Sequence, residues 1–406
     1  MKFFSQILLR PLLTLSLIVL SLLTISAPSH AQYTGPVDTT KAPAPVYSIK
    51  NVKISVQGFD HQDNAVLDIP HQFRGAQPLP DSLRIPEEKH LKNIRQLSFD
   101  GENAEAYLSP DGIHVSFQAR GPEAGSCDQI YTMTLDGRDV KRISDGKGRT
   151  TCSYYLPSGD KILYASTKGA LGGSCPPEPD FSKGYVWPLY PYFDIYVADT
   201  SGKEIGRLTQ NENFYDAEAT VSPVGDKIIF TSTRSGDIDL YSMNLDGTNV
   251  TQLTNEEGYD GGAFYSQDGK QIVYRASRPA GDELKEYREL LKQGLIKPHM
   301  LEIFLMDADG SHKRQLTHSN AASFAPYFYP DGKRVIFASN MADPKGRDFD
   351  LYMIHTDGTG LERITYNKTF DGFPVFTKDG KHLIFCSNRN GANPHNTNIF
   401  IADWVE

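Results

Sequence analysis

The chain has 406 residues, of which 41 are Lys or Arg and 50 are Asp or Glu, so its formal net charge is −9. This acidic balance argues against nucleic acid as a partner, because phosphate recognition depends on clustered basic side chains. It also argues against attraction to a membrane through a basic patch, and solubility alone accounts for it.

The first 31 residues have the pattern of a secretory signal peptide. Lys2 and Arg10 are basic, Pro11–Ser26 is apolar, and the tripeptide SHA that ends at Ala31 is a small-x-small cleavage site. The alternative is an uncleaved membrane anchor, but the apolar run is short for a span and no second run follows. We therefore expect a periplasmic or secreted mature chain that begins at Gln32 and has no stable membrane span.

Residues 32–89 are expected to form a linker and a segment without assigned structure. Tyr33–Pro45 is rich in Pro, Thr and Ala, which is typical of a flexible linker. Val46–Val56 predicts one or two strands. Gly58–Lys89 contains several prolines and has only weak periodicity, so no element is predicted there.

From about His90 onward one short phrase recurs six times, a turn with glycine followed by an apolar strand. It reads SPDGIHVSF in the first copy and TKDGKHLIF in the last. Successive turn glycines are 47, 66, 44, 63 and 48 residues apart, so two of the repeats carry insertions: Gly112, Gly159, Gly225, Gly269, Gly332 and Gly380. A recurring period of this length indicates a repeat architecture.

A second phrase alternates with the first, as in DLYSMNLDGTNVTQLT from Asp239. It has a β-rich run, a tight turn and a second short strand, which is a hairpin signal. Each unit therefore has four strands, which predicts an all-β, six-bladed β-propeller over residues 90–406. The last copy, Asn398–Trp404, stops after its third strand. We expect Asn93–Ser98 to supply the missing outer strand and close the ring, which removes exposed sheet edges.

These two phrases and the RQLT-like ending resemble the WD40-like repeat of TolB-type propellers, over Asn93 to Trp404. The resemblance implies a periplasmic or secreted protein that binds proteins or peptides through a face of the propeller. TolB itself places a sizeable α/β domain before its propeller, and Gln32–Lys89 lacks the βαβ periodicity of such a domain.

The inner strands of the blades are expected to begin at one mouth of the central channel. Two rows of residues stand at these starts, two positions apart, and hold three Asp and two Glu between them. Because both rows share strand parity, we expect both to point the same way. The candidate binding residues at this mouth are Asn103, Glu105, Asp216, Glu218, Asp260 and Asp371.

Carboxylates that lie close together repel unless a cation, a basic side chain or a proton intervenes. One interpretation is a site for a cationic peptide group, or for a metal such as Ca²⁺ held by Asp216, Asp260 and Asp371. The other is that each Asp caps its own loop by accepting hydrogen bonds from backbone N–H groups. Arg149 could also neutralise part of the ring. No other cofactor is expected.

The two insertions should lie on the same face as this mouth. The first, within Ser166–Phe193, holds four aromatic residues close together: Tyr185, Trp187, Tyr190 and Tyr192. Exposed aromatic rings on a rigid loop are a common binding signature, and the alternative is that they pack down on a neighbouring blade. The second, Ser277–Leu301, predicts an amphipathic helix with an apolar stripe that packs against the face: Leu284, Tyr287, Leu290 and Leu291.

Three of the four cysteines should open on the same face, namely Cys127, Cys152 and Cys175. In an oxidising compartment a disulfide among them is expected, either Cys152–Cys175 within one blade or Cys127–Cys152 between neighbours. Cys386 lies in a second strand and is expected to be buried and free.

The sequence lacks the hydrolase elbow G-x-S-x-G, HExxH and the P-loop, and no nucleophile is paired with a base. The favoured function is a non-catalytic binding or scaffold module for a protein, peptide or glycan of the envelope or secretome. The alternative is a metal-dependent enzyme of the lyase or glycosidase type, with Asp216 and Glu218 as its nearest carboxylate pair.

Overall fold

The structure, a computed structural model, describes residues 73–406 except 122–124, 182–183, 212, 392 and 394–395. The expected signal peptide (1–31), the linker and the strands within 46–56 lie outside the described residues. The expected unassigned segment falls partly inside them, from residue 73 onward.

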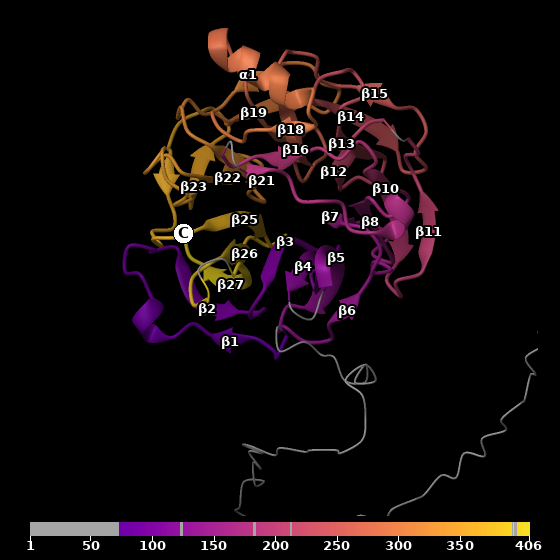
Figure 1. Ribbon diagram of the computed structural model, residues 1–406. Helices are drawn as coiled ribbons and strands as arrows, with labels where there is room; N and C mark the ends of the chain where they lie inside the picture. The colour runs from indigo at the N-terminus through magenta and orange to yellow at the C-terminus, as the bar shows by residue number, and fades with distance from the viewer. Residues whose placement is uncertain (1–72, 122–124, 182–183, 212, 392, 394–395) are drawn as a thin grey trace, which may run out of the picture. The chain divides into compact units, whose positions relative to one another are not determined.

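Six antiparallel sheets follow one another around a central axis (Figure 1), which confirms the prediction of an all-β propeller with six blades. Blade 1 consists of β3 (Glu102–Leu108), β4 (His114–Gly121), β5 (Gly125–Thr134) and β6 (Lys141–Arg142). Blade 2 consists of β7 (Thr150–Tyr155), β8 (Lys161–Ser166), β10 (Asp194–Asp199) and β11 (Glu204–Arg207). Blade 3 consists of β12 (Asp216–Val221), β13 (Lys227–Ser232), β14 (Asp239–Asn244) and β15 (Thr251–Gln252).

The remaining blades repeat this order. Blade 4 consists of β16 (Asp260–Tyr265), β17 (Gln271–Ala276), β19 (Glu302–Asp307) and β20 (Arg314–Gln315). Blade 5 consists of β21 (Ser323–Phe328), β22 (Arg334–Ser339), β23 (Asp350–His355) and β24 (Glu362–Arg363). Blade 6 has five strands: β25 (Asp371–Phe376), β26 (His382–Ser387), β27 (Asn398–Trp404), β2 (Leu91–Gln96) and β1 (Gln77–Pro78).

In blade 6 the outer strands come from the N-terminal side of the ring. β2 pairs antiparallel with β27, Leu91 facing Trp404, and it begins and ends two residues earlier than the expected Asn93–Ser98. The preceding segment, to which the sequence assigned no element, also packs on the blades and includes the short 3-10 helix η1 (Asp81–Leu83). Its Phe73 is buried against Phe117 of blade 1, with ring centroids 5.5 Å apart.

The glycine turns recur because their geometry recurs. In the first copy Gly112 has a φ of +71° and donates its N–H to Ser109 O at 2.9 Å, and the five other turn glycines also have positive φ. Each turn leads into a second strand that neighbouring blades cover on both faces, so that Ile228, Ile229 and Phe230 of β13 are fully buried. A strand buried on both faces reads as a continuous apolar run, which is why the phrase is so recognisable.

The two insertions come together on one face of the ring, which we call the insertion face. β9 (Trp187–Pro188) in the first pairs antiparallel with β18 (Leu295–Ile296) in the second. The first insertion also contains the 3-10 helix η2 (Leu171–Gly173). Sequence reasoning placed both insertions on one face but did not pair them, because two-residue strands leave no periodicity to read.

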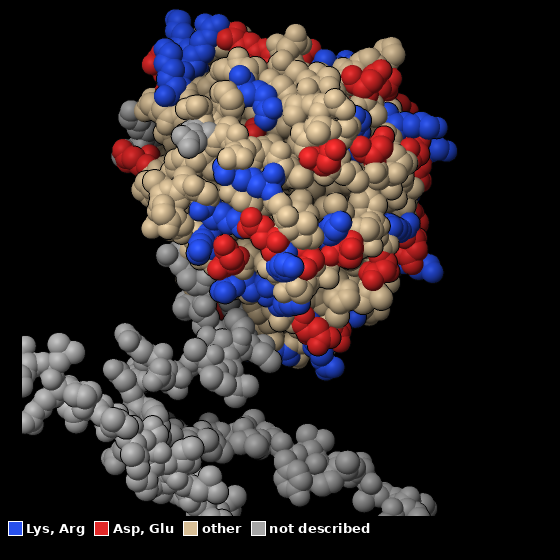
Figure 2. Space-filling model, turned by 90° about the vertical axis from the view of Figure 1, so that its right-hand side faces the viewer, with Lys and Arg blue, Asp and Glu red and all other residues tan. Residues whose placement is uncertain are grey.

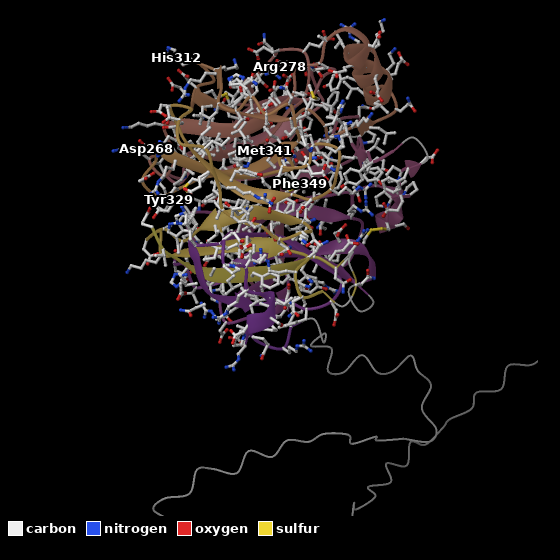
Figure 3. All side chains as sticks on the ribbon, turned by 90° about the vertical axis from the view of Figure 1, so that its left-hand side faces the viewer. Asp268, Arg278, His312, Tyr329, Met341 and Phe349 are labelled. Atoms are coloured by element: carbon white, nitrogen blue, oxygen red, sulfur yellow. A yellow bond between two sulfur atoms is a disulfide. The ribbon has the colours of Figure 1, made fainter. Side chains whose placement is uncertain are left out.

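The predicted helix is present as α1 (Gly281–Leu291), which buries Tyr287 and Leu290. In Figure 3, Phe349 lies toward the side of α1, whereas Asp268 and Tyr329 of the glycine turns lie on the opposite side of the ring. We call that side the opposite face. Within the described ranges no helix is long and apolar enough to cross a membrane.

Candidate functional site

A central cavity of about 1190 Å³ lies where the inner strands meet the insertion face. Side chains from all six inner strands line it, together with both insertions and the loops that follow β22 and β24. It exceeds the 300–1,000 Å³ typical of small-molecule pockets. Its size therefore suits a chain segment better than a small metabolite.

One position that all six inner strands share lines this cavity. It lies at a β-bulge with a positive φ between 50° and 58°, and its six occupants are Glu105, Cys152, Glu218, Gly262, Ala325 and Phe373. The ladder to the second strand shifts register at each bulge, as between Ala217 and Thr220 in blade 3. An extra residue in a strand re-aims its side chain, and the five occupants that have a side chain line the cavity together with Gly262. Two of the expected binding residues, Glu105 and Glu218, thus line the cavity.

The structure corrects the expectation for the row two positions earlier. Asn103, Asp216, Asp260 and Asp371 are at most 1 % exposed, and none of them lines the cavity. Strand parity alone implied that both rows face the axis, but the bulge separates them, because it breaks the simple alternation of the strand.

Each of the three aspartates of that row pairs with an arginine that follows the second strand of its own blade. Asp216 meets Arg234 at 2.9 Å, and Asp260 meets Arg278 at 2.8 Å. Asp371 meets Arg389 at 2.8 Å, and the same guanidinium binds Glu88 through two bonds of 2.9 Å. These aspartates therefore hold loops in place within their blades. Among the described residues no three His, Cys, Asp or Glu side chains are grouped to hold a metal ion.

Asn103 has a similar structural position. Its side-chain amide donates to Asp100 O at 2.7 Å and lies 3.2 Å from Asn398 Oδ1, so it joins the start of blade 1 to blade 6.

Glu218 is held by four donors. Thr231 Oγ1 donates to it at 2.7 Å, Tyr259 OH at 3.0 Å and the Gly262 N–H at 3.1 Å. The buried Arg275 guanidinium forms an ion pair with it. Although burial opposes the charge, Glu218 holds the pKa of Arg275 above its ordinary value.

Sequence reasoning missed Arg275, although a signal was present. In the repeated phrase the residue after the aromatic of the second strand is Gln, Ala, Thr, Ala or Cys in the other five blades, and in blade 4 it is Arg275. A basic residue inside a strand buried on both faces needs a partner. A Cβ at Gly262 would lie 2.4 Å from Arg275 Nη1, so glycine at that bulge makes room for the guanidinium.

Glu105 and Cys152 lie side by side in the cavity wall. Burial raises the pKa of Glu105 to about 7, while a hydrogen bond from Cys152 acts in the opposite direction. Burial, with the nearby carboxylates of Glu105 and Glu218, raises the pKa of Cys152 well above its ordinary value. The thiol is therefore protonated at neutral pH and is a poor nucleophile.

Acidic and basic side chains pair along the blade 1 and blade 2 side of the rim. Arg120 meets Glu102 at 2.8 Å, and Arg149 meets Asp128 at 3.5 Å and also pairs with Glu178. Burial raises the pKa of Asp128, although both arginines oppose that shift. Arg149 therefore neutralises acidic residues at the rim, namely Asp128 and Glu178, and does not pair with the aspartates at the starts of the inner strands.

The disulfide joins Cys127 to Cys175, beside these ion pairs. Both pairings considered from the sequence are wrong, because each used Cys152, whose bulge directs it to the cavity wall instead. The bond ties the β4–β5 side of blade 1 to the insertion of blade 2. Cys386 is buried and free, as predicted.

Of the four aromatic residues of the first insertion, Tyr185 is an exposed ring, whereas the other three contact neighbouring groups of the protein. Trp187 lies against Arg275, whose guanidinium is 5.1 Å from its ring, and Tyr190 donates a hydrogen bond to Pro177 O. Tyr192 stacks on Tyr190 and does not line the cavity. Tyr185 remains 50 % exposed at the rim, stacked on Phe181 with ring centroids 6.4 Å apart.

The outer flank of the ring that carries β11 shows no patch of a single charge among its described residues. Figure 2 shows basic and acidic side chains intermixed over the side that carries β11. Exposed aromatic rings, in contrast, gather on the insertion face: Phe181, Tyr185 and Phe214. The insertion face is thus the part of the described surface that is best suited to contact another molecule.

Comparison with known proteins agrees with this architecture. A family model described as the TolB beta propeller domain matches residues 192–293. An uncharacterized protein of Agrobacterium fabrum is 28% identical over 247 residues, which cover 60% of this chain and 68% of the relative. A TolB homolog of Chlorobium chlorochromatii is 29% identical over 142 residues, which cover 29% of this chain and 32% of that relative, so the match spans about a third of its length.

The chain also has a weaker likeness to solved structures. A structure described as a putative TolB from Agrobacterium tumefaciens is 18% identical, with a TM-score of 0.48, and the match covers 76% of this chain and 92% of that one. The repeats and the six blades show a six-bladed β-propeller, and the family match over residues 192–293 shows that it is similar to the TolB beta propeller domain.

Proposed function

We propose that the chain is a secreted or periplasmic binding module that captures a protein or peptide of the cell envelope or secretome on its insertion face. The observation that carries this proposal is the rim of the central cavity, where Phe181 and Tyr185 are 49 % and 50 % exposed. Large exposed aromatic rings beside a deep cavity are the kind of anchor on which protein interfaces depend.

Two observations support the compartment. The disulfide between Cys127 and Cys175 fits an oxidising environment such as the periplasm or the outside of the cell. The likeness to TolB proteins fits the same placement, and it also suggests that the partner is a protein of the envelope.

Binding is favoured over catalysis because the expected carboxylate pair is engaged elsewhere. A lyase or glycosidase would use Asp216 with Glu218 as acid and base. Asp216 is buried against Arg234, and Glu218 accepts hydrogen bonds from four donors. Carboxylates held in this way are poorly placed to exchange protons with a substrate.

The test is capture from an envelope extract with the mature protein that begins at Gln32. We expect a double variant, Phe181→Ser with Tyr185→Ser, to lose the partner because its apolar anchor is removed. The matched control changes two exposed apolar residues of the glycine turns on the opposite face, Ile113→Ser and Val224→Ser, and should keep the partner. Equal capture by both double variants would contradict the proposal.

A chelator arm tests the expected metal. Because the aspartates of the first row pair with arginines, we expect capture to be unchanged by removal of Ca²⁺. Loss of capture on chelation would show that a cation takes part in binding.

A further inference from the structure

Glu105 differs from the other carboxylates of the central cavity. Six carboxylate side chains line this cavity, and four of them form ion pairs with Arg120, Arg149 or Arg275: Glu102, Asp128, Glu178 and Glu218. Burial raises the pKa of a fifth carboxylate, Asp348, and the positive charge of Arg363 opposes that shift. Glu105 has no ion pair among the contacts of the described residues.

The backbone gives no structural reason for a carboxylate at this position. Glu105 has a φ of +57°, a region that costs a non-glycine residue roughly 1 kcal/mol. Ala325 and Phe373 occupy the same bulge in other blades, so the fold does not need a charged side chain there. At the equivalent position of blade 3 Glu218 binds Arg275, but Glu105 makes no comparable contact.

The surroundings of Glu105 leave its charge uncompensated. The titratable groups around it are Cys152 from β7, Glu218 from β12, Arg275 from β17 and Asp128 from β5. Tyr107 of its own strand and Cys386 of β26 also lie close, and both have raised pKa values because they are buried. Arg275 is already paired with Glu218, and the other basic side chains that line the cavity, such as Lys345 and Arg347, are not among the groups that act most strongly on Glu105. An ionised Glu105 therefore has no paired counter-charge of its own. Glu105 is only partly exposed, and a carboxylate in such surroundings is stabilised by a proton or a cation.

We infer that Glu105 binds a primary ammonium group of the captured peptide, which enters the central cavity from the insertion face. This inference deepens the proposed function by naming the ligand chemistry. An ammonium group would replace the proton as the counter-charge, and the same cavity is lined by aromatic rings, which attract cations: Tyr107, Tyr215 and Phe373. Tyr185 and Met300 line the cavity and are exposed, so the cavity is open to the surface.

The test measures binding of small probes to the full mature chain by calorimetry or by shifts in NMR spectra. The probes are methylammonium, N-acetyl-lysine methylamide, trialanine amide with a free amino terminus, and its N-acetylated form. We expect saturable millimolar binding of the first two, and no binding of the acetylated tripeptide, which lacks an ammonium group. Binding of free trialanine amide would identify a peptide N-terminus as an acceptable source, and its failure would restrict the source to a lysine side chain.

The pH dependence supplies an independent readout on the unmodified protein. Because burial raises the pKa of Glu105 to about 7, the affinity for methylammonium should rise about tenfold per pH unit below pH 7 and level off above it. For the free tripeptide the affinity should fall again above about pH 8, where an α-amino group loses its proton. A flat profile between pH 5 and 8 would overturn the inference.

The variant that tests the residue is Glu105→Gln, which keeps the shape and removes the charge. We expect methylammonium binding to fall at least about tenfold and its pH dependence to vanish. The matched control is Glu102→Gln, which removes another cavity carboxylate that is paired with Arg120, and it should leave probe binding unchanged. Equal losses in both variants would mean a diffuse electrostatic effect and would overturn the assignment.

Two outcomes separate the ammonium site at Glu105 from the interface at Phe181 and Tyr185. If Glu105→Gln still captures the envelope partner and no probe binds, the insertion face remains the binding site and the ammonium site is wrong. If the probes bind but Phe181→Ser with Tyr185→Ser leaves capture intact, the proposed interface is wrong and the ammonium site stands.

Discussion

At the scale of single residues, the bulge position of each inner strand decides which side chains line the centre of the cavity. Its occupants range from Glu105 and Glu218 to Gly262 and Phe373 on the same backbone conformation. Aligning the repeats was enough to find this position. The direction of the preceding row was not predictable, because a bulge is set by ladder hydrogen bonds between strands and leaves no mark in the spacing of the chain.

The first prediction concerns stability and pH. The ordinary pKa of Glu105 is 4.5 and its folded value is about 7, so the folded chain binds more protons than the unfolded chain between these pH values. The contribution of Glu105 to the free energy of unfolding therefore falls as pH rises through this window. We expect Glu105→Gln to be more stable than the unmodified protein by about 3 kcal/mol at pH 8, and by less than about 1 kcal/mol at pH 5. Chemical denaturation at both pH values checks this difference, and an equal effect at the two would contradict it.

The second prediction concerns Arg389. Its buried guanidinium binds both Glu88 and Asp371, so Arg389→Met leaves two buried carboxylates without a cationic partner. We expect a loss of about 3–5 kcal/mol in the free energy of unfolding. The matched control is Arg84→Met, which removes an exposed ion pair with Asp81 and should cost less than about 1 kcal/mol. A similar cost for both variants would show that the buried pair does not hold the N-terminal segment to blade 6.

At the scale of elements, the two insertions act as one structure. β9 pairs with β18, and residues of both insertions share an apolar cluster with blades 2 to 4, which includes Leu189, Tyr259 and Ile296. The sequence indicated the helix through its apolar spacing and indicated the aromatic loop through its composition. It could not show that the loops meet, since contacts between segments a hundred residues apart depend on the ring that places them side by side.

The third prediction concerns the disulfide. It spans 48 residues and ties the blade 2 insertion to blade 1. Replacing Cys127 and Cys175 together by Ser should cost about 2–4 kcal/mol, because the unfolded chain regains the entropy of an open loop. Alkylation of the unfolded, unreduced protein followed by mass spectrometry should label Cys152 and Cys386 alone. Labelling of Cys127 or Cys175 in that experiment would contradict the pairing, and Cys152→Ser is the control that should leave the disulfide intact.

At the scale of the whole molecule, closure of the ring and the position of the insertions produce two unlike faces. The opposite face carries the six glycine turns, which are short and similar and include Asp268 and Tyr329 (Figure 3). The insertion face carries the cavity and the exposed aromatic rings. The six-bladed fold followed from the repeats, because every copy supports the others. The nature of the site did not follow from the repeats, because the ion pairs of Arg234 with Asp216 and of Arg275 with Glu218 join positions that the repeat alignment treats separately.

Crosslinking from two positions on opposite faces shows whether a protein or peptide binds the insertion face. A photo-crosslinking amino acid is placed at Tyr185 on the insertion face or, in a second protein, at Ile113 on the opposite face, both of which are exposed. After irradiation in an envelope extract, we predict one specific crosslinked partner from position 185 and none from position 113. Crosslinks from position 113 alone, or the same products from both positions, would contradict the account.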